Sequence, residues 1–287
     1  TSYSTFIFEN ATVKGSSLQG GIAVGGNASF SSVSVGTGLA ADAGRYDIVT
    51  GGSLHFNNGS ISKGSAIAGG KATTANYSSY GTVASNVNVT SVVDFESQAA
   101  LLSKNSAYWG SLTANGSSEY KWGGYLLNGT DSAMNVFNLD AGILDAVSYL
   151  NLSVPQNSTV LFNIYGMNAG ITNMGFSGLP TISNVIFNFV DATSLTITGV
   201  SVSGTVLAPN ADVKFMNGNI LGQLVAKNLA TNHGTSIQGA AFNGGLPLPI
   251  VHPSVDPSVP ASDVPEPQTY AMAAMGLLAI GFFRREK

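Results

Sequence analysis

The sequence contains no cysteine and little charge. Only 9% of its 287 residues are Asp, Glu, Lys or Arg, against about 25% in ordinary soluble proteins. Without cysteine the chain has no disulfide bonds, no thiolate metal ligands and no thiol nucleophile, which suits an extracellular protein. Because charges are so few, amides and hydroxyls must provide most of the solvated surface.

Basic residues are also scarce, and they are scattered along the chain. The sequence has 11 Lys and Arg and a formal net charge of −4. Proteins that bind nucleic acids carry clusters of cations that neutralise phosphates, so nucleic acid is not expected as a partner and polyanion binding is disfavoured. The first residues show neither the basic segment nor the apolar run of a signal peptide. We therefore expect an exported form of this protein to have lost its signal peptide already.

Repeated short segments in the main body predict a β architecture. The segment Ile22–Ala28 returns in outline as Ile48–Leu54 and Ala66–Ala72, and each is an apolar strand that ends at a Gly-Gly corner. Later, Val202–Asn210 matches Ile220–Asn228 at a shift of 18 residues. Because one coil of a β-solenoid can have this length, we predict stacked coils about 4.8 Å apart. An ordinary β-sandwich is the alternative.

One α-helix is expected within this domain. Asp94 can cap a run in which apolar side chains from Phe95 to Trp109 recur near the helical period until Gly110 ends it. We expect its apolar stripe to pack on the solenoid. The 45 residues 146–190 carry no charged side chain, which predicts central strands buried on at least one face.

A proline-rich segment separates the main domain from the end of the chain. Seven of the ten prolines lie between Pro247 and Pro267, a spacing that favours extended polyproline II and excludes a packed helix or central strand. We therefore predict a β domain over residues 1–246 and a semi-rigid linker over residues 247–264.

The last residues form an apolar run with a basic end. Tyr270–Phe283 would make a helix of about 21 Å, shorter than the roughly 30 Å of a hydrocarbon core. The run has no polar face, and the cations that follow it match the cytoplasmic side of a membrane segment. They are Arg284, Arg285 and Lys287. We predict a short membrane helix, with a buried amphipathic helix as the alternative.

The order of these features resembles the PEP-CTERM sorting signal of Gram-negative bacteria. A Pro-Glu-Pro triad, Pro265, Glu266 and Pro267, precedes the apolar run and its basic end, so the resemblance covers residues 265–287. It implies that an exosortase recognises the triad and processes the protein near it. It also implies that the helix holds the protein in the bacterial membrane before processing.

The main body resembles the choice-of-anchor A domain of bacterial surface proteins over most of residues 5–246. The resemblance rests on short segments in order: Gly20–Asn27, Val136–Asp140, Val160–Ile164, Val185–Phe189, Gly204–Ala211 and Gly222–Ala226, followed by His233, Phe242 and Leu246-Pro247. It implies an exported protein of the cell envelope, cell surface or extracellular matrix. It supplies no catalytic site.

Residues that could support catalysis or metal binding do not form a recognised motif. The three histidines lack zinc-ligand spacing, and Ser177 lacks the Gly-x-Ser-x-Gly elbow of a nucleophile. Asp140, Asp145 and Asp191 could pair as the carboxylates of a glycosidase, but a turn cap is the simpler role for such residues. We therefore expect no enzyme activity, no metal site and no cofactor. The histidines are His55, His233 and His252.

Two functional hypotheses follow. The first is a structural or adhesive protein of the bacterial surface or matrix, which can self-associate into filaments through its exposed end coils. The second is a carbohydrate-binding or carbohydrate-active solenoid that contacts glycans through its densest aromatic region. Packing of the helix is the alternative role of these aromatic residues, and the Thr-rich strand Ser194–Thr198 would suit ice binding only if neighbouring coils repeated it. The aromatic residues are Tyr108, Trp109, Tyr120, Trp122 and Tyr125.

Overall fold

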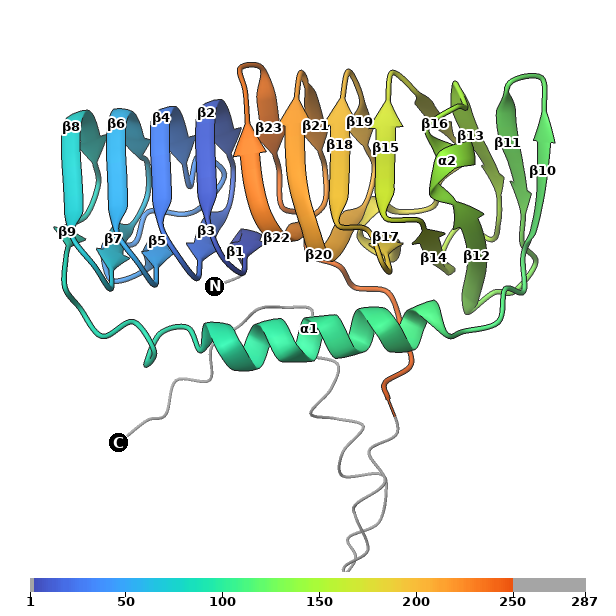
Figure 1. Ribbon diagram of the computed structural model, residues 1–287, viewed down its shortest axis with the longest axis horizontal. Coiled ribbons are helices and arrows are strands. Elements are labelled where there is room, and N and C mark those ends of the chain that lie inside the picture. The colour runs from blue at the N-terminus through green and yellow to red at the C-terminus, as the bar shows by residue number, and fades with distance from the viewer. Residues whose placement is uncertain (1–2, 250–287) are drawn as a thin grey trace, which may run out of the picture.

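The chain winds into a row of stacked coils with a long helix along one side (Figure 1). The structure is a computed structural model and describes residues 3–249. The first part of the chain forms the coils at one end of the row. Its strands are β1 (Tyr3–Ile7), β2 (Ala11–Leu18), β3 (Gly21–Val24), β4 (Ala28–Val35), β5 (Tyr46–Thr50), β6 (Leu54–Ile61), β7 (Ser65–Ala68), β8 (Ala72–Ser79) and β9 (Val83–Ala84).

After β9 the chain crosses back along the stack as α1 (Phe95–Gly110) and then winds a second series of coils (Figure 1). This series also contains α2 (Ala141–Leu144) and the 3-10 turn Ile182–Asn184. Its strands are β10 (Ser117–Lys121), β11 (Gly124–Asn128), β12 (Met134–Asp140), β13 (Tyr149–Ser153), β14 (Thr159–Tyr165), β15 (Asn168–Thr172), β16 (Gly175–Ser177), β17 (Val185–Phe189), β18 (Ser194–Thr198), β19 (Ser201–Val202), β20 (Thr205–Met216), β21 (Gly218–Ile220), β22 (Leu224–Thr231) and β23 (Thr235–Ile237).

The two series of coils join in the middle of the stack. The last coil pairs in parallel with the first, so that Val225 of β22 lies opposite Phe6 of β1 and Ser236 of β23 lies opposite Ser17 of β2. Among the described residues, only the β10–β11 hairpin is antiparallel. Strands from the two ends of the domain therefore form one continuous sheet.

Each coil presents three sides. The helix face, which lies against α1, contains β12, β14, β17, the first residues of β20 and β22, and β1, β3, β5, β7 and β9. The groove face contains β15, β18, the later residues of β20 and β22, and the first halves of β2, β4, β6 and β8. The second halves of these last four strands continue into the narrow face, beside β19, β21 and β23.

Two apolar clusters hold the fold together. The larger one fills the solenoid with inward-facing side chains that stack from coil to coil. Phe137, Phe162 and Phe187 form such a stack, with ring centroids 5.6 and 4.8 Å apart. The second cluster lies outside the helix face, where Leu102 and Trp109 of α1 cover outward-facing apolar residues of the strands. The sheet of the helix face is therefore buried on both sides.

Two kinds of corner allow the coils to stack closely. Gly51 sits directly on the preceding coil, and a Cβ there would lie 2.0 Å from the carbonyl oxygen of Gly25. The corner between the groove and narrow faces is left-handed in coil after coil, which suits Gly and Asn. Its residues have φ between 47° and 79° and are Gly15, Ser32, Asn58, Asn76, Asn173, Gly199, Asn217 and Gly234.

The structure confirms the main predictions for the described part of the chain. It is a parallel β-solenoid rather than a sandwich, and Ile22, Ile48 and Ala66 of the early repeats lie in register. Val206 lies opposite Leu224, as the shift of 18 residues requires. The helix begins and ends where expected, and the uncharged segment contains β17, which is fully buried, and β14, which is buried except at Tyr165.

Asp94 caps the first turn of α1. Its carboxylate accepts hydrogen bonds from the backbone N–H of Ser97 at 3.0 Å and from the Ser97 hydroxyl at 2.7 Å. These hydrogen bonds hold the pKa of the Asp94 carboxyl below its usual value. The sequence signal for the start of the helix thus corresponds to a real cap.

A row of amides attaches the C-terminal half of α1 to the sheet. Asn188 is fully buried, donates to the Ser106 carbonyl oxygen at 3.0 Å and to Asn163 Oδ1 at 2.9 Å, and accepts from the Ser106 hydroxyl at 2.6 Å. Asn163 in turn donates to the Trp109 carbonyl oxygen at 2.7 Å. Further along the stack, the same row continues with Leu207 and the residues in register with it, so the helix rests on amides at one end and on apolar groups at the other.

We expect Asn188→Ala to lower the free energy of unfolding by about 2–3 kcal/mol, because it leaves buried groups of Ser106 and Asn163 without partners. Urea unfolding measures the change. Asn219→Ala is the matched control, since Asn219 is only partly buried and its amide makes a single hydrogen bond to Ser201; its effect should stay below about 0.5 kcal/mol. Equal losses in both variants would contradict the role assigned to the amide row.

Candidate functional surfaces

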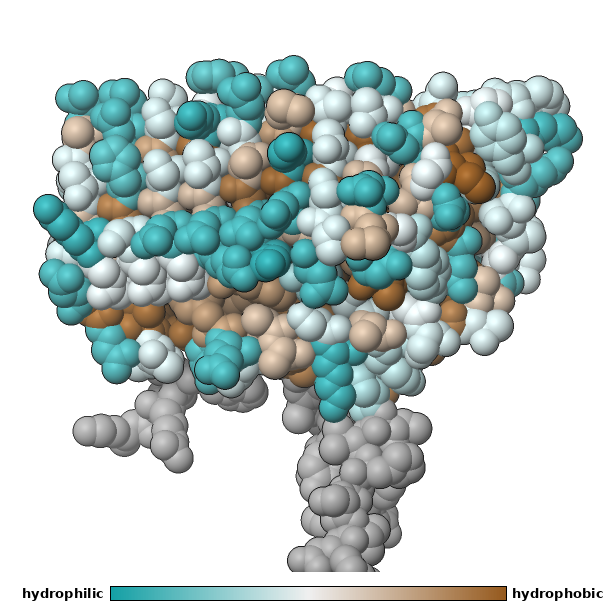
Figure 2. Space-filling view, in the orientation of Figure 1, coloured by the Kyte–Doolittle hydropathy of each residue, from teal (hydrophilic) through white to brown (hydrophobic). Residues whose placement is uncertain are grey.

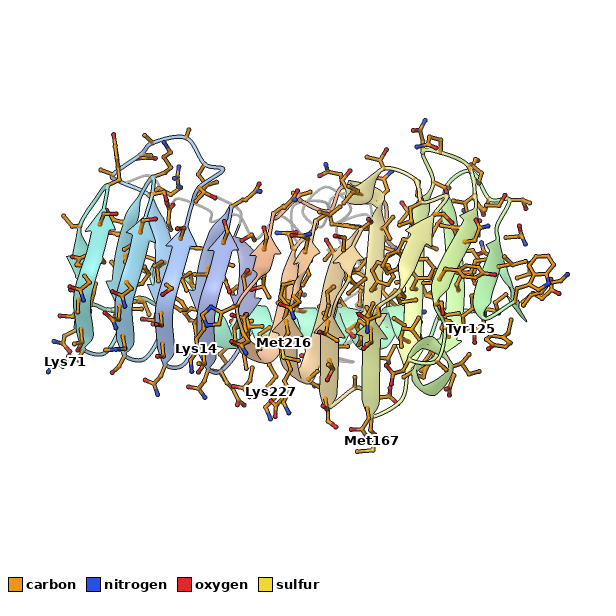
Figure 3. All side chains as sticks on the ribbon, turned by 90° about the horizontal axis from the view of Figure 1, so that it is seen from above. Lys14, Lys71, Tyr125, Met167, Met216 and Lys227 are labelled. Carbon is orange, nitrogen blue, oxygen red and sulfur yellow. The ribbon has the colours of Figure 1, made fainter. Side chains whose placement is uncertain are left out.

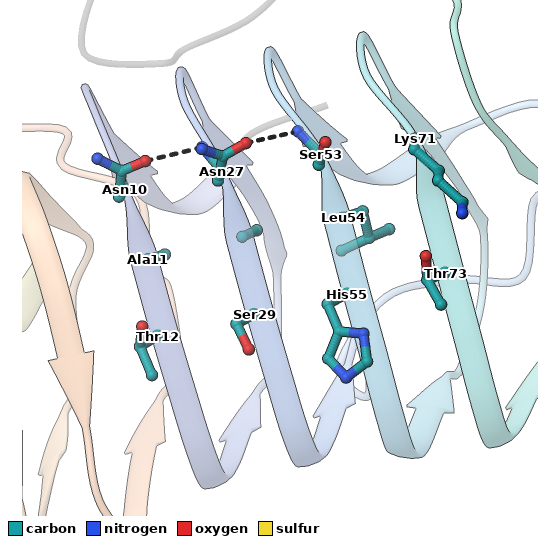
Figure 4. Close-up of a pocket in the computed structure, with 11 residues that line it drawn as sticks. Asn10, Ala11, Thr12, Asn27, Ser29, Ser53, Leu54, His55, Lys71 and Thr73 are labelled. Atoms are coloured by element: carbon teal, nitrogen blue, oxygen red, sulfur yellow. Dashed lines mark hydrogen bonds between the residues drawn. The ribbon is translucent and has the colours of Figure 1, made fainter.

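A shallow groove crosses β2, β4, β6 and β8 on the groove face (Figure 4). Its upper row consists of Asn10, Asn27, Ser53 and Lys71, one residue from each coil at the position just before each strand. A second outward row lies beside it and consists of Thr12, Ser29, His55 and Thr73, which are in register. The residues between the rows form the floor, where Ala11, Ala28 and Leu54 are buried. Figure 2 shows hydrophilic side chains gathered in a band along the stack.

The upper row of the groove is ordered by hydrogen bonds between coils. Asn10 Oδ1 accepts from the backbone N–H of Asn27 at 2.9 Å, and Asn27 Oδ1 accepts from the backbone N–H of Ser53 at 2.8 Å (Figure 4). Asn228 Oδ1 likewise accepts from the backbone N–H of Asn10 at 2.8 Å. This last bond crosses the junction between the two series of coils. Asparagine side chains therefore connect successive coils here, and two of them, Asn10 and Asn27, also line the groove.

A second surface lies on the hairpin that ends the stack on the opposite side. Trp122 sits at the tip of the β10–β11 turn with 78% of its surface exposed, and Tyr120 beside it is 58% exposed. Trp122 has φ +52°, a left-handed conformation that favours Gly, Asn or Asp at such turns. The Lys121 ammonium lies 4.7 Å from the centroid of the Trp122 ring.

The structure divides the five aromatic residues that sequence analysis grouped together. Trp109 is 1% exposed and donates from its indole to the Pro247 carbonyl oxygen at 2.7 Å, and Tyr108 packs at the edge of the same cluster beneath α1. Tyr125 is 6% exposed, and burial together with the Asp140 carboxylate raises the pKa of its hydroxyl. Only Tyr120 and Trp122 present their rings to solvent.

Two of the three candidate catalytic carboxylates accept hydrogen bonds from the backbone. Asp140 caps α2 by accepting from the backbone N–H groups of Gly142 and Ile143 at 2.9 and 3.1 Å. Asp191 accepts from the backbone N–H of Gly166 at 2.7 Å, whereas Asp145 is exposed. Within residues 3–249, no cluster of His, Asp or Glu has the geometry of a metal site.

The threonine pattern of β18 continues in the neighbouring coils at only one position. Thr196 is flanked in register by Gly170 and Lys214. Thr198 is flanked by Thr172 and Met216. The flat hydroxyl array that the sequence alone left open is therefore limited to Thr196, Thr198 and Thr172.

The sorting and membrane-flanking residues lie outside the described residues, as does His252. They are Pro265, Glu266, Pro267, Arg284, Arg285 and Lys287. Over the part of the chain that the structure describes, no helix combines the length and hydrophobicity needed to cross a membrane.

Sequence analysis did not identify the groove. Its signal was nevertheless present, because the repeated Gly-Gly corners are each followed by one polar residue, Asn27, Ser53 or Lys71. The sequence alone did not show that these positions align across coils or that His55 lies beside them.

Two family models match the chain. Residues 1–238 match a family described as "Putative Ice-binding-like adhesive domain", and this match reaches the end of β23, the last strand of the solenoid. Residues 263–285 match the PEP-CTERM protein-sorting motif, which confirms the sorting signal expected at the end of the chain. Searches of curated proteins and of solved structures find no match.

Proposed function

Since the chain belongs to the family of ice-binding-like adhesive domains, we propose that it is a non-enzymatic adhesin of the choice-of-anchor A type that acts in the cell envelope or extracellular matrix. The adhesive domain and the PEP-CTERM motif together indicate an exported surface protein of a Gram-negative bacterium. The observation that carries the proposal is the extent of the adhesive-domain match, which takes in every strand of the solenoid.

The architecture supports a mechanical role. Each coil hydrogen-bonds to its neighbours along three faces, and the side chains inside it stack on those of the next coil. A stacked array of this kind buries the apolar face of each repeat against two others and resists local unfolding. The solenoid thus provides a stiff platform on which side chains are displayed at the spacing of the coils.

We expect exosortase to process the protein near Pro265, Glu266 and Pro267. Intact mass and fractionation of the protein from its native cells should show loss of the residues after this triad, with the protein in the envelope or medium. Replacing the triad with three alanines should leave Lys287 in place and retain the protein in the membrane. Pro253→Ala with Pro257→Ala in the linker is the control and should be processed normally. An intact tail in the wild-type protein would contradict processing.

Self-association is proposed to occur through β8. This strand is eight residues long, has no charged side chain, and within the described residues pairs only with β6. Edge strands that avoid pairing usually carry charges or are covered. At the opposite end, β10 carries Glu119 and Lys121, and Asn115 hydrogen-bonds to the outer edge of β12. One open edge favours a two-fold pair of β8 strands, whereas a filament requires two complementary ends.

Sedimentation velocity of the full chain in mild detergent should therefore detect a concentration-dependent dimer. Ala75→Lys places a charge on the outward side of β8 and should shift the protein to monomer, because it puts a like charge on the pairing strand of both copies. Ser118→Lys on β10 is the control at the other end. A monomer at all concentrations, or equal effects of both variants, would exclude association through β8.

A second candidate function is carbohydrate binding at the terminal hairpin. The specific observation is Trp122, a large apolar ring exposed at a left-handed turn position where Asn or Gly would be less strained. Strain retained at an exposed position points to a contact role. Tyr120 extends the same aromatic surface.

Trp122→Asn tests this candidate, because Asn suits the turn. The free energy of unfolding should stay unchanged or rise by up to about 1 kcal/mol, while binding on a glycan array should be lost. Tyr80→Ala is a matched control, since Tyr80 is 55% exposed at the other end of the stack. Glycan binding that survives Trp122→Asn would rule out the hairpin as the contact surface.

A further inference from the structure

We propose that the groove across β2, β4, β6 and β8 binds an acidic polysaccharide through the carboxylates of its uronic acid residues. This inference rests on the adhesive function proposed above and assigns it a ligand class and a surface. The groove lies far along the stack from the terminal hairpin (Figure 1), so the two surfaces are separate.

The orientation of the groove amides makes them donors toward solvent. The Oδ1 atoms of Asn10 and Asn27 each accept from the backbone of the next coil, so neither amide can flip without losing that hydrogen bond. Both residues are exposed, and no hydrogen bond within the described residues uses either Nδ2 atom. Two N–H donor groups are therefore held in a line, one coil apart, with no protein acceptor.

Two lysine side chains and an imidazole lie on the same face. Lys71 and His55 line the groove, and Lys14 projects from the same face, where Figure 3 shows Lys71, Lys14 and Lys227 along one side of the stack. Lys14 and Lys71 are exposed and belong to none of the ion pairs found in residues 3–249. The chain has no Asp or Glu in residues 10–41 or 48–93, so β2, β4, β6 and β8 carry no acidic side chain.

The acidic side chains next to these strands are engaged: Glu9 directly precedes Asn10 in the same coil, and Asp212 lies on β20, beyond the junction. Glu9 pairs with Lys227 at 3.7 Å and accepts from Asn228 at 3.1 Å. Asp212 accepts from the same Asn228 amide at 2.8 Å. The strands β2, β4, β6 and β8 therefore carry only basic and uncharged side chains, and the carboxylates beside them are ion-paired or hydrogen-bonded, within a chain of net charge −4.

The spacing of the donors favours a linear, repeating ligand. The coils repeat at about 4.8 Å, close to the advance of one sugar ring in an extended glycan. One row of the groove offers amides and an ammonium, and the row beside it offers hydroxyls and an imidazole. These groups match a polysaccharide that carries a carboxylate and hydroxyls on each sugar. A small anion would contact the donors of a single coil only. Single-stranded nucleic acid is a poorer fit, because no Phe, Tyr or Trp side chain lines the groove for base stacking.

The test measures binding of the full chain to polygalacturonate and to the same polymer after complete methyl esterification, which removes the charge but keeps the sugar backbone. We expect binding to the acid form only, weakening as salt is raised. Asn27→Asp keeps the Oδ1 acceptor for Ser53 but replaces the donor with negative charge, and Lys71→Gln removes a cation. Each should lower affinity by about fivefold or more.

Two variants control for charge and for fold. Asn219→Asp makes the same chemical change on the narrow face, and Lys63→Gln removes a lysine that does not line the groove; both should bind within about twofold of wild type. Equal binding of the esterified polymer, or equal losses in variants and controls, would overturn the proposal. If cells that display the chain adhere but the purified chain does not bind polygalacturonate, the ligand proposed for the groove is wrong while the adhesive function stands. If the cells do not adhere, the adhesive function itself fails.

Discussion

Hydrogen bonding between parallel strands of successive coils is the constraint on which the rest of this structure depends. It requires every coil to return to the same register, so that an inward residue always lies on an inward residue and a corner on a corner. The aromatic stack inside, the left-handed corners and the Gly-Gly steps all follow from that requirement. The same constraint aligns outward side chains into rows and so produces the extended surfaces on which the proposed functions rest.

The closure of the stack depends on α1. The chain winds away from its first coil, and α1 carries it back along the stack so that the second series can end against β1 and β2. The helix is held by the amides of Asn163 and Asn188 and by the apolar cluster around Trp109. At the junction, the Asn228 side chain accepts a hydrogen bond from the backbone of the first coil, just as the Asn10 side chain accepts one from the backbone of the second. Two distant parts of the sequence therefore behave as one array.

Much of the fold was predictable, because local patterns encode it. The Gly-Gly repeats, the shift of 18 residues and the Asp94 cap correspond to coils, register and helix as expected. The junction was not predictable, since pairing of β22 with β1 depends on a return path that no local pattern records. The grouping of the aromatic residues was misleading for the same reason. Trp109 and Trp122 are close in sequence, but Trp109 is buried and Trp122 is exposed. Lys14 and Lys71 appear scattered in the sequence, and only the coil register brings them to one face.

We propose that the solenoid has an adhesive role at the cell surface and that the tail serves to place it there. The most direct measurement is the adhesion of the native cells to an acidic polysaccharide surface under flow, with the chain deleted and then restored. Adhesion should fall on deletion and return with the wild-type chain, provided that the solenoid reaches the cell exterior. Adhesion that is unchanged by deletion, while the restored protein is demonstrably exported, would contradict the central claim.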